Sequence, residues 1–144
     1  MVLVALYKVD AKGANYIDTA ISWFSRSKYT HVELVLSDGY MYSSSPRDDG
    51  VRRKKHIKDD SSWDYIAVDA DEANILKFYE MTKKSDYDIK GIFGFVFPVS
   101  DRTSKWFCSE WCANALKISD IEIFWKTSPH KLKPSDMYTI LNKR

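Results

Sequence analysis

A cysteine and a histidine are the residues of this sequence whose types and settings best suit chemistry. Cys108 lies in the run Lys105–Leu116, which contains no glycine or proline, and Ser104 is a suitable N-cap, so we predict a helix beginning within a residue or two of Cys108. The unpaired N–H groups and positive dipole end of a helix start favour a thiolate. They can also receive an oxyanion. A nucleophile at this position needs a base, and we predict that His31 supplies it.

His31 is accompanied by a carboxylate at strand spacing. It lies in the strand-like run Tyr29–Leu36, and Glu33 follows two residues later. Residues i and i+2 of a strand project from the same face, so His31 and Glu33 should lie together, opposite Val32 and Leu34. A neighbouring carboxylate favours a charged imidazole and suits general-base work. A solvent-facing polar pair explains the spacing equally well.

The second cysteine is predicted to be structural. Cys112 falls one helical turn after Cys108, on an interior stripe with Leu116, which indicates core packing. Most free cysteines are small buried hydrophobes, and the helix start is what distinguishes Cys108. One C-x-x-x-C pair supplies too few ligands for zinc, so we expect neither a metal nor a cofactor. Two cysteines do not form a disulfide framework, and reduced thiols indicate a cytosolic protein.

The bulk properties indicate one globular domain over residues 1–144. The hydrophobic fraction of 44% and aromatic fraction of 15% can supply a core, and the net charge of +2 implies no strongly charged partner. No apolar run approaches the length of a membrane span. The N-terminal run 2–7 lacks a basic lead-in and predicts a strand rather than a signal peptide. We therefore expect a cytoplasmic location.

The pattern of apolar residues and turn signals predicts an α+β fold. Strands are predicted at 2–9, 31–36, 40–44, 51–58 and 63–68, and helices at 14–26, 69–83, from 108 onward and at 136–141. The Asp38-Gly39 pair between two β-prone runs predicts a hairpin. Asp69 and Glu72 have the spacing of a capping box, which predicts a helix start at Asp69. The apolar run 121–125 is predicted to be buried, and segment 87–98 fits either a short helix or an irregular wall.

The basic run Arg52–Lys58 has two interpretations. A charged edge strand is protected by its charge against aggregation. The alternative is a surface for an anionic substrate or nucleic acid, which a steep salt dependence would reveal. Because no nucleic-acid-binding module is recognisable, we favour the edge strand and expect no nucleic-acid partner.

Two stretches together carry a family resemblance. Tyr29–Gly39 and Trp106–Leu116, supported by Gly50–Arg52 and by residues 87–97, resemble the circularly permuted NlpC-type papain-like cysteine hydrolases, in the small bacterial and phage branch grouped with the YiiX-like proteins. In unpermuted relatives the cysteine helix precedes the histidine strand, whereas here it follows. The resemblance implies a papain-like fold, with an antiparallel sheet packed against helices.

The same resemblance implies roles for the site residues. Cys108 would be the nucleophile, His31 the base and then the acid, and N–H groups at the helix start would form the oxyanion hole. A third polar residue orients the imidazole in the family. Many relatives place His, Asn or Gln for this on the next strand, where this chain offers Ser43, Ser44 and Ser45. We therefore assign the orienting role to Glu33, with Ser43 as the fallback.

The resemblance thus implies a cofactor-free cysteine hydrolase. Its substrate would be a peptide, amide or acyl compound, thioesters included, cleaved through an acyl-enzyme. A phage-encoded protein of this kind would act in the host cytoplasm. The alternative is a catalytically silent papain-like fold that binds another protein, with Trp106, Trp111 and Trp125 as interface anchors.

Overall fold

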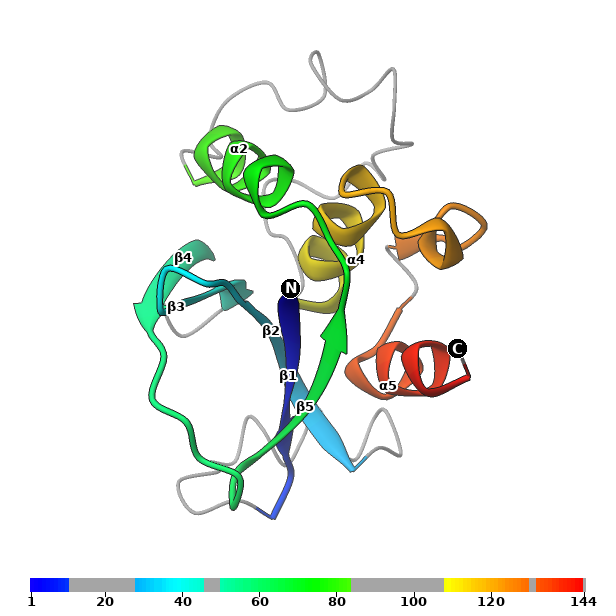
Figure 1. Cartoon of the computed structure of the whole chain (residues 1–144). Helices are drawn as coiled ribbons and strands as arrows, with labels where there is room; N and C mark the ends of the chain where they lie inside the picture. Colours follow the sequence, from blue (N-terminus) through cyan, green and yellow to red (C-terminus); the bar gives the residue numbers. More distant parts are fainter. Residues whose placement is uncertain (11–27, 46–49, 84–107, 130–131, 144) are drawn as a thin grey trace.

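The computed structural model describes residues 1–10, 28–45, 50–83, 108–129 and 132–143 of the chain. Within them, a five-stranded antiparallel sheet packs against helices in an α+β arrangement (Figure 1). The strands are β1 (Val2–Lys8), β2 (Tyr29–Val35), β3 (Tyr40–Ser45), β4 (Gly50–Lys55) and β5 (Trp63–Val68). The helices are α2 (Glu72–Thr82), α4 (Cys108–Ile118) and α5 (Pro134–Asn142), with the short 3-10 helix η2 (Glu122–Phe124) between the last two. The five predicted strands are confirmed. The predicted helix over 14–26, segment 87–98, Ser104 and Trp106 lie outside the described residues.

The sheet has the strand order β4-β3-β2-β1-β5, and every neighbouring pair is antiparallel. The predicted hairpin joins β2 to β3, because the Leu36 carbonyl accepts from the Gly39 N–H and the Leu36 N–H donates to the Tyr40 carbonyl. Gly39 has a φ of 83°, a conformation that glycine adopts without steric cost. This turn fixes the register of the histidine strand.

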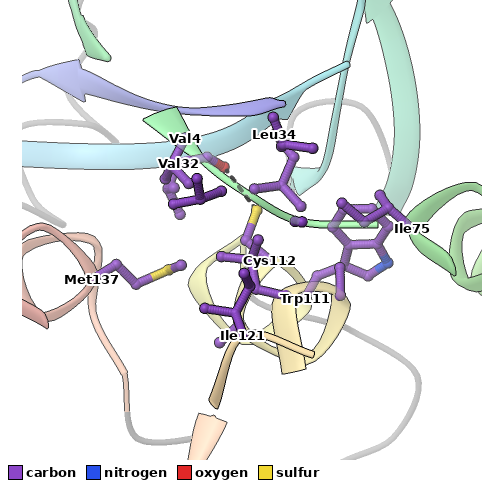
Figure 2. Packing of buried hydrophobic residues seen from close by; sticks show 14 of the residues in the cluster. Val4, Val32, Leu34, Ile75, Trp111, Cys112, Ile121 and Met137 are labelled. Carbon is purple, nitrogen blue, oxygen red and sulfur yellow. Dashed lines mark hydrogen bonds between the residues drawn. The ribbon is translucent and has the colours of Figure 1, made fainter. Parts of the chain in front are cut away.

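The helices cover one face of the sheet. Alternate residues of β1 and β2, such as Val4, Val32 and Leu34, point toward them, as expected for the two-residue period of strands (Figure 2). The same core contains large side chains from each helix that the structure describes: Phe78, Trp111, Leu116, Phe124 and Met137. The opposite face carries a smaller apolar cluster around Ala5, Val35 and Met41. The larger part of the described core therefore lies between the sheet and the helices.

Strand β4 forms one edge of the sheet, opposite β5. The side chains of Arg53, Lys54 and Lys55 are exposed there, which confirms the prediction of a charged edge strand. Arg52 differs from them, because its side chain is only 14% exposed. One basic residue of the run is thus directed into the structure.

Helix α2 starts later than predicted. Asp71, not Asp69, is its N-cap, because the Asp71 carboxylate accepts hydrogen bonds from the Ala73 and Asn74 N–H groups. Ala70 is buried in the core, and the chain needs two more non-helical residues to place it there. Glu72 consequently falls at the first helical position, where its carboxylate accepts from the backbone N–H of Ser37 at 3.2 Å.

The tail also departs from its prediction, because Glu122 and Trp125 of the run 121–125 are exposed. Ile121 and Phe124 are buried as expected, but Trp125 is 52% exposed and its indole N–H donates to the Lys117 carbonyl at 3.3 Å. The 3-10 turn places Trp125 on the outer side of the chain. In the described part of the chain, no helix has the length and apolar character that crossing a membrane requires.

Candidate active site

Strand β2 presents His31 and Glu33 from one face, as predicted. His31 Nε2 lies 2.9 Å from Glu33 Oε1. The β1–β2 register pairs Tyr7 with His31 and then Lys8 with Tyr29, so Thr30 is an extra, bulged residue just before the histidine. A bulge re-aims the side chains next to it and is common beside active sites.

The β2 backbone is open toward β3 near the histidine. Among the described strand residues, the two strands pair only at Leu34–Tyr42 and Val35–Met41, next to the hairpin. Further along, the Val32 carbonyl accepts hydrogen bonds from Ser43 Oγ at 2.7 Å and from Cys112 Sγ at 3.6 Å. Figure 2 shows the Cys112 sulfur directed at Val32. Side chains therefore replace the strand ladder here, and the gap admits helix α4.

Cys108 lies at this gap, in the first described turn of α4. The imidazole of His31 and the backbone of Val32 and Ser109 lie close enough to its sulfur to lower the pKa of the thiol. A Ser109 N–H deep inside a helix would be bonded to the preceding turn, so its contact with sulfur is typical of a helix start. Since Nε2 of His31 is engaged by Glu33, we infer that Nδ1 is the nitrogen that faces the thiol.

Charge favours an ion pair between cysteine and histidine. Burial alone would raise the pKa of the Cys108 thiol, but the charge of His31 and the hydrogen bonds to the sulfur lower it below its usual value. Burial alone would lower the pKa of His31, but the Cys108 thiolate and then Glu33 raise it to about 10. Shifts in opposite directions favour a thiolate beside an imidazolium at neutral pH.

Glu33 is held from its other side by Arg52. The carboxylate is almost fully buried, with 4% of its side chain exposed, and accepts from Arg52 Nη1 at 2.6 Å and from Nη2 at 2.7 Å. Burial alone would raise the pKa of Glu33, but the hydrogen bonds from Arg52 and His31 and their charges lower it to about 2. A continuous series of interactions therefore links the Cys108 sulfur, through His31 and Glu33, to the Arg52 guanidinium.

Comparison with known proteins adds nothing to this geometry. No protein-family model, curated protein or solved structure matches the chain.

The three residues predicted to form the site lie together. Cys108, His31 and Glu33 are in contact in that order, although they come from α4 and β2. Ser43, the fallback for the orienting role, lies next to this cluster on β3 but makes other bonds. Its hydroxyl donates to Val32 and lies 3.8 Å from Cys112 Sγ, and it is Glu33 that bonds Nε2 of His31.

The prediction that Cys112 is a core residue is confirmed. It has no exposed surface, it forms no disulfide, and burial raises the pKa of its thiol well above the usual value. Its sulfur packs one turn below Cys108, on the stripe shared with Leu116. Within the described ranges, no three His, Cys, Asp or Glu side chains are grouped in a way that could hold a metal ion.

Arg52 is the member of this cluster that the sequence reasoning missed. It lies on β4, opposite Ser43 of β3, and its side chain reaches Glu33 on β2. One signal was available, because a carboxylate on a buried strand face requires a cation. Choosing Arg52 among several basic neighbours, however, requires the register of three strands.

Proposed function

We propose that the protein is a papain-like cysteine hydrolase that cleaves a peptide, amide, ester or thioester bond through a covalent acyl group on Cys108. The observation that carries the proposal is the Cys108 sulfur at the first described turn of a helix, in contact with His31 and two backbone N–H groups. These are the conditions under which a thiol becomes a nucleophile. A nucleophile helix packed on the antiparallel sheet that supplies the histidine also supports the permuted NlpC-type arrangement.

The first half-reaction acylates the enzyme. The Cys108 thiolate attacks the substrate carbonyl carbon, a C–S bond forms, and the carbonyl π electrons move to oxygen. N–H groups at the start of α4 are the donors available to that oxyanion. As the oxyanion collapses, the bond to the leaving nitrogen, oxygen or sulfur breaks, and the His31 imidazolium gives its proton to the leaving group.

The second half-reaction releases the acid. Neutral His31 takes a proton from a water molecule, which attacks the thioester carbon, and the C–S bond then breaks to restore the Cys108 thiolate beside the imidazolium. Glu33 stays ionised throughout and holds the Nε2–H side of the ring, so that Nδ1 keeps facing the sulfur. No group outside the chain other than water and substrate is needed to balance these steps.

The alternative of a silent protein-binding module receives less support. It predicts exposed aromatic anchors, yet Trp111 has no exposed surface and its indole N–H donates to Thr82 Oγ1 at 2.9 Å. The interpretation of Trp111 as an anchor is therefore wrong, because its side chain fills the space between α4 and α2. Trp125 is exposed, but its indole N–H donates to the carbonyl of Lys117. Lys117 lies in the last turn of α4, at the opposite end of that helix from Cys108.

An acyl-transfer probe tests the proposal directly. With p-nitrophenyl acetate we expect a burst of p-nitrophenol matching the enzyme concentration, because deacylation of the thioester is slower than its formation with so activated an ester. Mass spectrometry of the acid-quenched protein should show one acetyl group on the peptide that contains Cys108. A protein that shows neither burst nor adduct, or an adduct only on lysines, would contradict the proposal.

A further inference from the structure

The contact between Glu33 and Arg52 joins the site to the edge of the sheet. We propose that Arg52 is a positioning residue, which fixes both oxygens of Glu33 and thereby keeps the His31 imidazole aimed at the Cys108 sulfur. The inference deepens the proposed function and rests on it. It gives Arg52, which lies on a different strand and does not touch the sulfur, a part in activating the nucleophile.

The geometry of the contact is that of a two-pronged clamp. Arg52 Nη1 bonds Oε2 and Nη2 bonds Oε1, and Oε1 is the same oxygen that lies 2.9 Å from His31 Nε2. A planar guanidinium can hold both carboxylate oxygens at once, whereas an ammonium group acts as a point charge. The carboxylate cannot turn away from His31 without breaking at least one of these short bonds.

The charges along the cluster alternate in sign. With Cys108 as a thiolate and His31 as an imidazolium, as the proposed function requires, negative and positive groups follow one another from α4 through β2 to β4. The titratable or charged groups that interact with Glu33 in the described structure come from β2, β4 and α4, and they are His31, Arg52 and Cys112. Ala5 is the partner of Glu33 on β1, and Ser43 on β3 lies between Glu33 and Arg52. Neither neighbouring strand therefore supplies a cation that could replace the guanidinium.

The burial of the pair explains why the clamp is needed. Only 4% of the Glu33 side chain and 14% of the Arg52 side chain are exposed, so water contributes little to holding the carboxylate ionised. With Arg52 removed, Glu33 would take up a proton at a higher pH. The neutral carboxyl would then stabilise the imidazolium less, and the thiolate would be lost at a higher pH as well.

The pH profile of Cys108 alkylation by iodoacetamide, followed on its peptide by mass spectrometry, tests this role. In Arg52→Gln we expect the midpoint of the acidic limb to move up by about one pH unit or more. Arg52→Lys keeps the charge but loses the fork, and should move the midpoint in the same direction by less. Arg53→Gln removes the neighbouring, exposed guanidinium and should keep the wild-type profile.

A double-mutant cycle separates this role from a merely structural one. If Arg52 acts through Glu33, the variant carrying Glu33→Gln and Arg52→Gln together should have the same midpoint as Glu33→Gln alone. Removing both partners leaves no lone buried charge, so the double variant should fold at least as well as either single one. Additive shifts, or a wild-type midpoint in Arg52→Gln, would overturn the inference. Should Arg52→Gln not fold, an unshifted Arg52→Lys would overturn it. Failure of the proposed function would look different: ordinary thiol behaviour in the wild-type protein itself.

Discussion

Replacing Cys108 with alanine should abolish both labelling by iodoacetamide near neutral pH and hydrolysis of p-nitrophenyl acetate above background. The nucleophile is lost, so no acyl-enzyme can form, and we expect the enzymatic rate to fall by about 10³-fold or more. The matched control is Cys112→Ala, which removes a thiol one helical turn away. Because Cys112 is fully buried and its thiol pKa is raised, that variant should keep both labelling and hydrolysis.

The two cysteine variants together test the assignment of Cys108 as the nucleophile. Equal labelling of Cys108→Ala and Cys112→Ala would mean that the sulfur at the helix start is not distinguished by its setting, and the nucleophile assignment would fail. Loss of hydrolysis in Cys112→Ala with normal labelling of Cys108 would point to damage of the core rather than chemistry. Thermal melts of both variants tell these cases apart.

Replacing Glu33 with glutamine should be the most destabilising change among the site residues. It leaves the largely buried Arg52 guanidinium without a carboxylate, and breaking a buried ion pair in this way costs about 3–5 kcal/mol. Urea denaturation near neutral pH measures the loss of unfolding free energy. Glu122→Gln removes an exposed carboxylate and should change the stability by less than about 0.5 kcal/mol.

The cost of Glu33→Gln should also depend on pH, with a definite sign. The pKa of Glu33 is lowered from its ordinary value of 4.5 to about 2, so its ionised form stabilises the folded state fully above 4.5. That contribution is lost as the pH falls toward about 2, where the wild-type carboxyl also becomes neutral. The difference in the free energy of unfolding between wild type and Glu33→Gln should therefore become smaller as the pH falls over that interval. A difference that is independent of pH would show that the ion pair is not what the substitution removes.

Local patterns in the sequence carried much of the fold and part of the site. The Asp38-Gly39 turn and the two-residue period of the strands place His31 and Glu33 on one face, and the structure confirms that placement. The helix that carries Cys108 follows from helical spacing in the same way. These features depend on neighbours within a few residues, and single-sequence reasoning is suited to them.

The remaining features depend on contacts between distant elements. The Val32 N–H is free to reach the Cys108 sulfur only because β2 and β3 separate beyond Leu34, which no local pattern reveals. Arg52 reaches Glu33 across β3, which requires the register of three strands. Helix α2 is capped by Asp71 rather than by the predicted Asp69, because burial of Ala70 outweighs the capping-box spacing of Asp69 and Glu72.

The most direct test of the central claim is the pH dependence of Cys108 alkylation in the wild-type protein and in His31→Ala. We expect a wild-type midpoint well below the free-cysteine pKa of about 8.5, because the thiolate is paired with the imidazolium. In His31→Ala the midpoint should return to that value or rise above it, since burial then acts unopposed. A midpoint near that of a free thiol in both proteins would contradict the account, because it would show that Cys108 and His31 do not form an activated pair.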